Sequence, residues 1–336
     1  MTSRRSSIGV LVAVACALLA ASSPAAASSS VYAPLDRPGP ALDVPDAMLA
    51  AALQCTGGVA GAARDPILLV PGTNLDPQSN YAWNYERAFT ALGWPYCTIA
   101  LPYKNMGDIQ VAGQYLVFAI RTAHELSGRP IDILGFSQGG MLPRWALRFW
   151  PDTRPMVNAF VALDPSNHGT LDAWAVCHVL CPPAYWQQAT GSHFLDALNS
   201  DAETFAGISY TVVYSRADEV VTPNLDADGS SSLHTGDGAI ADIAVQDICP
   251  ADLSDHLAMG SYDPVAYALA IDAFSHGGLA DSARIPRSVC LQPFQPGVNP
   301  ATFVADYAEY DASIGAALLQ SPEVWAEPPL ASYVFG

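Results

Sequence analysis

The sequence predicts an α/β fold in which helices cover both faces of a mostly parallel sheet. First, short apolar runs rich in β-branched residues alternate with longer amphipathic segments, as parallel strands and their connecting helices do. Second, 51% of the 336 residues are hydrophobic and only 14% are charged, so the chain can bury a large core. Third, no internal repeat or second linker interrupts this alternation, which favours one domain over residues 28–336.

The fold is expected to begin with an extended arm over residues 28–46, which are rich in Ser, Pro and Asp. The apolar run PILLV (66–70) predicts a buried strand that leads into the loop PGTNLDPQSN. A helix at NYERAFTALG and a strand at CTIALP follow. Apolar residues then recur at helical spacing over residues 108–126, which predicts an amphipathic helix.

The second half of the chain continues the pattern less regularly. Strands are predicted at 131–136, 157–164, 210–215 and near ADIAVQDI, and helices from about Gln138 to Phe149, at FLDAL and at 263–274. Residues 165–190 interrupt the alternation, and the tail after about residue 300 is expected to be helical and then irregular.

The first 27 residues have the composition of a secretory signal. Arg4 and Arg5 precede an apolar stretch from Ile8 to about Ala21, and small residues lead to Ala27. The apolar stretch is too short to span a bilayer comfortably. We therefore expect a signal peptide over residues 1–27 and a secreted protein, by either the general or the twin-arginine route.

Charge and cysteine content argue against binding to nucleic acid, anionic membranes or zinc and indicate disulfides. With 32 acidic and 14 basic residues the net charge is −18, which disfavours binding to nucleic acid or anionic membranes. Removal of Cys16 with the signal leaves six of the seven cysteines, an even number that predicts three disulfides without fixing their pairing. Cys177 and Cys181 are the only close pair, and no second pair completes a zinc site, so no metal is expected.

The stretch Gly135-Phe136-Ser137-Gln138-Gly139 matches the nucleophile elbow of the α/β-hydrolase fold. A predicted strand precedes it and a predicted helix follows, as that motif requires. Glycines beside Ser137 accommodate the strained backbone of such a turn. The sequence therefore predicts Ser137 as a nucleophile, and Pro143 is expected to kink the helix behind it.

A serine nucleophile needs a base, which in this fold follows the acid in the sequence. His234, His256 and His276 are late enough in the chain. His234 lies in a polar loop, and His276 follows a predicted helix as an ordinary C-terminal residue would. His256 lies after the last predicted strand and before that helix, where a catalytic loop belongs, and we favour it.

The acid is predicted at Asp218, which leaves the carboxyl end of a predicted strand. Glu219 is expected to point away, and Asp226 and Asp228 to be solvated. Asp164, at the end of another strand, is the main alternative. Oxyanion donors are predicted at the amide of Gln138 and at the amide and hydroxyl of Thr73, in the loop after the first strand.

Five segments, PILLVPGT, SQGG, ADEVV, SDHLA and WQQATGS, together resemble the secreted lipases typified by lipase B of Candida antarctica. The resemblance covers about residues 50–292 and keeps the spacing of the triad nearly unchanged. It implies an α/β-hydrolase fold and the same triad and oxyanion donors. It also implies polar contacts to the acyl group from Asp164 and Gln188, which makes Asp164 less probable as the triad acid. The implied disulfides are Cys55–Cys97 and Cys249–Cys290.

The sequence departs from this family at three places. Phe136 stands where the fungal enzyme has tryptophan, beside the nucleophile on the alcohol side of the pocket. Cys177 and Cys181 fall in the segment that resembles the helix at the pocket mouth, and a Cys177–Cys181 disulfide would staple it. The tail after Cys290 does not resemble the family and is expected to reshape one wall of the pocket.

The sequence thus predicts a secreted serine-dependent hydrolase of carboxylic esters, with triacylglycerol or a related lipid ester as substrate and with no cofactor, metal or obligate protein partner. The apolar segment 171–186 is expected to contact acyl chains or, transiently, a lipid interface. A non-lipolytic carboxylesterase or polyester hydrolase remains an alternative, since the fold and triad of all these enzymes are the same and do not distinguish their substrates. So does a catalytically silent, secreted binding protein. Calcium binding at LDADGSSS is disfavoured by its spacing.

Overall fold

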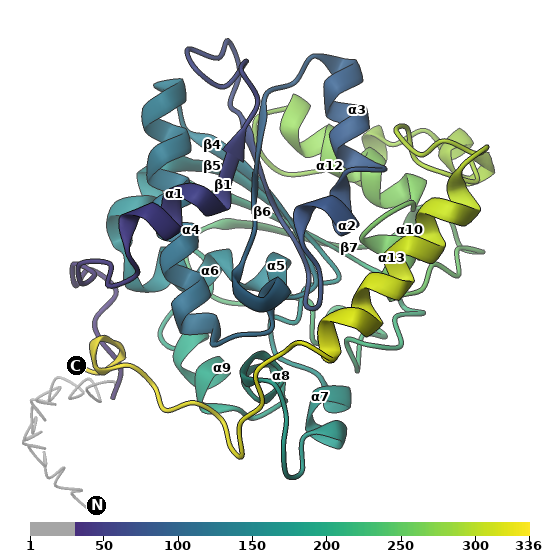
Figure 1. Cartoon of the computed structure of the whole chain (residues 1–336). Coiled ribbons are helices and arrows are strands. Elements are labelled where there is room, and N and C mark those ends of the chain that lie inside the picture. The colour runs from purple at the N-terminus through teal and green to yellow at the C-terminus, as the bar shows by residue number, and fades with distance from the viewer. Residues whose placement is uncertain (1–30) are drawn as a thin grey trace, which may run out of the picture.

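A sheet of seven strands organises residues 31–336, the part of the chain that this computed structural model describes (Figure 1). The signal peptide predicted over residues 1–27 lies outside it. The strand order is β1-β3-β2-β4-β5-β6-β7, with β1 antiparallel to β3 and all other neighbours parallel. The strands are β1 Leu53–Cys55, β2 Ile67–Val70, β3 Tyr96–Ile99, β4 Ile131–Phe136, β5 Val157–Leu163, β6 Ser209–Tyr214 and β7 Ala239–Ala244. The α/β class expected from the sequence is therefore confirmed.

The helices connect these strands. They are α1 Asp46–Ala52, α2 Pro77–Tyr81, α3 Tyr85–Leu92, α4 Ile109–Ser127, α5 Gln138–Met141, α6 Pro143–Phe149, α7 Leu171–Val176, α8 Pro183–Gln188, α9 His193–Leu198, α10 Val245–Ile248, α11 His256–Met259, α12 Pro264–Ser275 and α13 Phe303–Leu318. Within residues 31–336, no helix has both the length and the apolar character needed to cross a membrane.

The central strands are apolar throughout because helices cover both faces of the sheet. Leu68 and Val70 of β2 pack into a core formed with α1, α4, α6 and α9. Ile67 and Leu69 of the same strand pack into a second core with α3 and α12. Figure 1 shows these two helical layers on either side of the sheet.

Several predicted elements differ from those observed. The arm predicted over 28–46 is followed by α1 and β1, which the sequence did not reveal. The helix predicted from about Gln138 to Phe149 is divided into α5 and α6. Pro143 is the first residue of α6, where the missing N–H is tolerated, so the chain breaks there as expected from the proline. ADIAVQDI forms the end of β7 followed by α10 rather than one strand.

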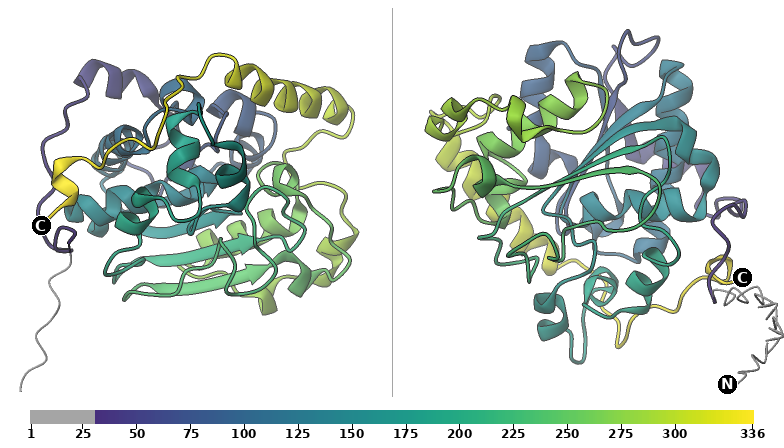
Figure 2. Two further views of the ribbon diagram at one scale, coloured as in Figure 1. Left: turned by 90° about the horizontal axis from the view of Figure 1, so that it is seen from below. Right: turned by 180° about the vertical axis from the view of Figure 1, so that it is seen from behind.

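The last residues, 320–336, form an extended segment that we call the strap. It crosses the lower part of the molecule in Figure 1 and ends beside the N-terminal arm, as Figure 2 also shows. Val324 makes two backbone hydrogen bonds with Cys181, of 3.1 and 2.9 Å. The Glu327 carboxylate accepts the backbone N–H groups of His193 and Phe194 at the start of α9. The strap thereby joins the helices around the pocket to the arm.

Candidate active site

Ser137 lies on a sharp turn between β4 and α5. Its φ of 55° and ψ of −124° are unfavourable for a residue with a side chain. The turn is possible because a Cβ at Gly135 would overlap the carbonyl oxygen of Gly139, and a Cβ at Gly139 would overlap that of Val70. Both positions therefore require glycine, as the motif predicted. The strained turn holds the Ser137 hydroxyl at the carboxyl ends of the strands.

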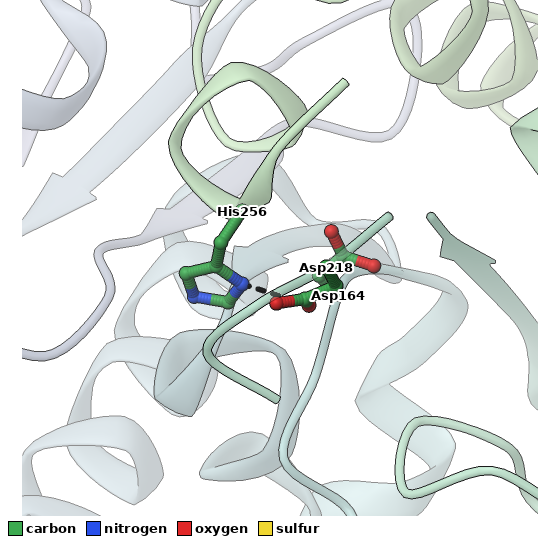
Figure 3. A group of neighbouring side chains, drawn as sticks. All are labelled: Asp164, Asp218 and His256. Carbon is green, nitrogen blue, oxygen red and sulfur yellow. Dashed lines mark hydrogen bonds and ion pairs between the residues drawn. The ribbon is translucent and has the colours of Figure 1, made fainter. Parts of the chain in front are cut away.

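His256 and Asp218 complete a hydrogen-bonded chain with Ser137. The His256 Nε2 atom lies 3.0 Å from the Ser137 Oγ, and His256 Nδ1 lies 2.9 Å from the Asp218 Oδ2. Figure 3 shows the imidazole turned toward the carboxyl group of Asp218. The other carboxylate oxygen of Asp218 accepts the backbone N–H groups of Val220 and Val221, at 2.8 and 2.9 Å. All three side chains are buried, so their hydrogen bonds are shielded from water.

Local contacts fix the loop that carries His256. The Asp255 carboxylate caps α11 by accepting the backbone N–H of Ala258 at 2.8 Å. The Ser215 hydroxyl, at the end of β6, donates to the carbonyl of Ser254 at 2.6 Å. The centre of the Phe136 ring lies 4.8 Å from the centre of the His256 imidazole. The position of the imidazole is therefore fixed by contacts within its own loop, by the residue that follows β6 and by Phe136, which precedes the nucleophile.

The alternative histidines lie elsewhere. His234 is exposed and its ring stacks on that of His168 at 5.4 Å. His276 pairs with Asp272 at the end of α12. Neither is hydrogen-bonded to Ser137 in the described part of the chain.

The alternative acids also lie outside the chain of hydrogen bonds to Ser137. Asp226 and Asp228 are exposed, as expected. Glu219 does not simply point away, because its carboxylate accepts the backbone N–H of His256 at 3.2 Å. Glu219 and His256 are 37 positions apart, so no local sequence pattern predicts this contact.

Asp164 lies behind Asp218 rather than on the cavity wall. It is fully buried at a φ of 39°, and its Oδ1 accepts the backbone N–H of Ser215 at 2.7 Å. One carboxylate oxygen from each of Asp164 and Asp218 and one ring nitrogen of His256 all lie within 4.8 Å of one another (Figure 3). Burial and the neighbouring charge of Asp218 raise the pKa of Asp164 well above its usual range, so this carboxyl group is neutral. Asp164 does not line the cavity next to Ser137, and its polar contact with the acyl group stays a prediction.

Thr73, Gln138 and Gln188 form a hydrogen-bonded group at the site. The Thr73 hydroxyl donates to Gln138 Oε1 at 2.8 Å, and Gln188 Nε2 lies 3.1 and 3.0 Å from the Thr73 Oγ1 and Gln138 Oε1. Gln138 Nε2 donates to Asn105, a residue that sequence patterns did not single out. Among residues 31–336, no acceptor engages the backbone N–H of Thr73 or of Gln138. The two N–H groups are thus available for a developing oxyanion, and the Thr73 hydroxyl joins them only if it gives up its hydrogen bond to Gln138.

These groups border a cavity of about 280 Å³. Its wall combines the reactive residues with mostly apolar side chains from α7, α8, α13 and the loops: Thr73, Asn74, Leu75, Phe136, Ser137, Ser166, Thr170, Asp172, Ala173, Val176, Tyr185, Gln188, Val220, Val221, His256, Leu257 and Ile314. Ile314 comes from the tail after Cys290, so the tail does form part of the wall, as expected. The match to lipase B covers 88% of the chain and so reaches into this tail, which corrects the expectation that the tail does not resemble the family. Around the mouth, Leu171, Trp174 and Val176 of α7 are exposed.

Six cysteines form three disulfides. The pairs are Cys55–Cys97, Cys177–Cys181 and Cys249–Cys290. The first joins β1 to β3 and the last joins the segment after α10 to the segment after α12. Cys177–Cys181 closes the short loop that follows α7, which is the arrangement that would staple the mouth helix.

Comparison with known proteins places this geometry in a family. The Lipase (class 2) family matches residues 64–242. Lipase B of Pseudozyma antarctica is 32% identical over 302 residues, which cover 88% of this chain and 86% of that protein. The crystal structure of Aspergillus fumigatus lipase B superposes with a TM-score of 0.79 at 29% identity and covers 89% of this chain and 74% of that one. The fold is that of the α/β-hydrolases, and the chain belongs to the class 2 lipase family of hydrolases.

Proposed function

We propose that the protein is a secreted, serine-dependent carboxylic ester hydrolase that cleaves triacylglycerols or related lipid esters through an acyl-enzyme. The observation that carries this proposal is the continuous hydrogen-bonded chain from Asp218 through His256 to Ser137, at the wall of a largely apolar cavity. Three disulfides and the secretory composition of residues 1–27 support export.

In the proposed acylation step, the Ser137 Oγ attacks the ester carbonyl carbon while its proton passes to His256 Nε2. Asp218 orients the imidazole and stabilises its positive charge without taking the proton. The carbonyl oxygen becomes negative and is bound by the N–H groups of Thr73 and Gln138. The Thr73 hydroxyl turns from Gln138 Oε1, which keeps its hydrogen bond from Gln188, and donates to the oxyanion as well. Collapse of this intermediate breaks the bond to the alcohol, which leaves with the proton from His256.

Deacylation follows the same steps, with water as the nucleophile in place of Ser137. A water molecule gives one proton to His256 and attacks the acyl carbon, and the same donors bind the oxyanion. When the bond to Ser137 breaks, the proton returns from His256 to the Ser137 Oγ and the carboxylic acid is released. Apart from the ester and water, each proposed step uses only side chains and backbone N–H groups of this chain.

Initial rates on p-nitrophenyl esters from acetate to palmitate test the proposal. Ser137→Ala is expected to lower kcat by about 10⁴-fold or more, because the remaining site retains only binding and oxyanion contacts. His256→Ala should cause a loss of similar order, whereas His234→Ala, which removes an exposed imidazole, should retain the wild-type rate. Equal inactivity of wild type and Ser137→Ala on every ester would support a catalytically silent binding protein instead.

A non-lipolytic carboxylesterase or polyester hydrolase is the second candidate. It is favoured by the anchoring of α7 at both ends, since the Thr170 hydroxyl donates to the Val220 carbonyl and Cys177–Cys181 closes the other end. Such a helix opens less readily on a lipid surface. The acyl-length optimum in the same series separates the two, because a lipase prefers long chains and an esterase short, soluble ones.

A further inference from the structure

Two polar side chains of the cavity wall have no part in the proposed catalytic steps. Asn74 follows Thr73 directly, and Tyr185 lies on α8, three residues before Gln188. Both line the cavity beside Ser137. The Asn74 Nδ2 donates a hydrogen bond to the Tyr185 hydroxyl oxygen at 3.0 Å. The two residues therefore form a contacting pair inside the pocket.

Each member of this pair keeps one hydrogen-bonding group that the protein does not use. Asn74 is only 4% exposed, and its Oδ1 is a buried acceptor without a partner. The Tyr185 hydroxyl accepts from Asn74, but no group within residues 31–336 accepts its proton. Burial raises the pKa of Tyr185 above its ordinary value, so the hydroxyl remains a donor at neutral pH. The Tyr185 hydroxyl is thus free to donate to a ligand, and the unpartnered Asn74 Oδ1, which is closed to solvent in this structure, can accept from a ligand group once the side chain turns toward the cavity.

Other polar residues of the wall are engaged within the protein. The Ser166 hydroxyl donates to Gln188 Oε1 at 2.9 Å, and the Thr170 hydroxyl donates to a backbone carbonyl. The backbone of Asn74 has a φ of 67°, a conformation that glycine favours and that asparagine tolerates.

The position of the Asn74–Tyr185 pair indicates whether it contacts the acyl part or the alcohol part of an ester substrate. Tyr185 and Gln188 are three residues apart on α8 and share a face of that helix, and Gln188 is hydrogen-bonded to Thr73. The pair therefore belongs to the oxyanion side of the pocket. The departing alcohol must lie near His256 Nε2 to receive its proton, and His256 makes no hydrogen bond or ring contact with Asn74 or Tyr185 in the described chain.

We infer that Asn74 and Tyr185 form a polar recognition point on the acyl side of the pocket, which selects esters whose acyl chain carries a hydroxyl group. A hydroxyl donates to the Asn74 Oδ1 and accepts from the Tyr185 hydroxyl at the same time, so it satisfies both unused groups. A plain alkyl chain satisfies neither. This inference rests on the proposed ester hydrolysis at Ser137.

The test compares ethyl hexanoate with the ethyl hydroxyhexanoates that carry the hydroxyl at each carbon from the second to the sixth. The readout is the ratio of kcat/KM for each hydroxy ester to that for ethyl hexanoate. Tyr185→Phe removes the donor, and Asn74→Gly removes the acceptor without backbone strain. Tyr103→Phe is the matched control, since Tyr103 is 63% exposed and lies outside the cavity. Melting temperatures near that of the wild type establish that the variants are folded.

The wild type should prefer at least one hydroxy ester. Each pocket variant should lower that ratio about five- to tenfold, the effect of one uncharged hydrogen bond, while Tyr103→Phe keeps the wild-type ratio. No preference in the wild type, or an unchanged ratio in both pocket variants, would overturn the inference but not the proposed function. A wild type that fails to hydrolyse even ethyl hexanoate would overturn both.

Discussion

Asp164 is a buried carboxyl group in close contact with the acid of the proposed triad, Asp218. Two buried carboxyl groups as close as those of Asp164 and Asp218 do not both ionise, because their mutual repulsion is not screened by water. Burial and the charge of Asp218 raise the pKa of Asp164, which favours the neutral form of Asp164, while Asp218 is hydrogen-bonded to His256. Asp164 thus acts on the reaction through another residue.

Asp164→Asn tests this role through the pH profile. Loss of the Asp164 proton would place a second negative charge beside Asp218, so the wild-type kcat/KM should fall wherever Asp164 ionises. Asparagine has a similar shape and does not ionise, so the variant should retain activity through the pH range in which the wild type declines. Profiles of kcat/KM from about pH 6 to about pH 10 measure this. Asp228→Asn, at an exposed position, should follow the wild type; an Asp164→Asn profile that also follows it would disprove the role.

Among the elements, α7 is held at both of its ends. Near its first turn, the N–H of Leu171 donates to the Thr222 carbonyl at 3.1 Å. At its last turn, Cys177 is bonded to Cys181, which in turn pairs with Val324 of the strap. These contacts fix both ends of a short helix that carries exposed apolar residues, and we expect them to limit its motion.

Removal of the staple in the double variant Cys177→Ala/Cys181→Ala should free α7. Amide hydrogen exchange over residues 171–181 should become faster by about tenfold or more, because local opening no longer has to overcome the constraint of the closed loop. The variant should also gain activity when tributyrin passes from solution into emulsion, a rise that the wild type lacks. Cys55→Ala/Cys97→Ala removes a disulfide at the sheet edge and should leave exchange in this segment unchanged. Equal exchange in the wild type and the staple variant would contradict this prediction.

The elements predictable from sequence are those with strong local signals. Continuous apolar runs indicated β2, β4, β5 and β6, and the glycine pattern indicated the turn at Ser137. By contrast, α1 and β1 are short and are stabilised by packing on α4 and β3, which no local pattern encodes. The contacts of Glu219, Asn105 and the Asn74–Tyr185 pair likewise join residues 33 or more positions apart. Such contacts appear only once the chain is folded.

On the scale of the whole molecule, we propose that residues 31–336 form one domain, since both cores pack against the same sheet. Buried polar groups connect its loops. Glu203 is 4% exposed, its Oε1 lies 2.6 Å from His168 Nε2, and its Oε2 accepts the N–H groups of His234 and Thr235. Burial alone would raise the pKa of Glu203, but the hydrogen bond with His168 and the charge of Arg144 lower it to about 2.

Glu203 should therefore contribute to stability in a pH-dependent way. The folded state holds this carboxylate ionised, whereas the unfolded chain takes up the proton near its ordinary pKa of 4.5. The contribution is fully present above that pH and is lost as the pH falls toward about 2. Urea denaturation should show that the free energy of unfolding falls less steeply over this range in Glu203→Gln than in the wild type or in Glu309→Gln, an exposed control. Parallel curves for all three proteins would contradict the assignment.

The central claim is that Ser137 is the nucleophile activated by His256. Its most direct test is reaction with diethyl p-nitrophenyl phosphate, followed by mass spectrometry of the peptides. We predict one diethylphosphoryl group per chain, on Ser137, with one equivalent of p-nitrophenol released. Ser137→Ala should take up no label, and His256→Ala should react far more slowly, whereas His234→Ala should react as the wild type does. A label on another residue, or ester hydrolysis that persists in Ser137→Ala, would contradict the claim.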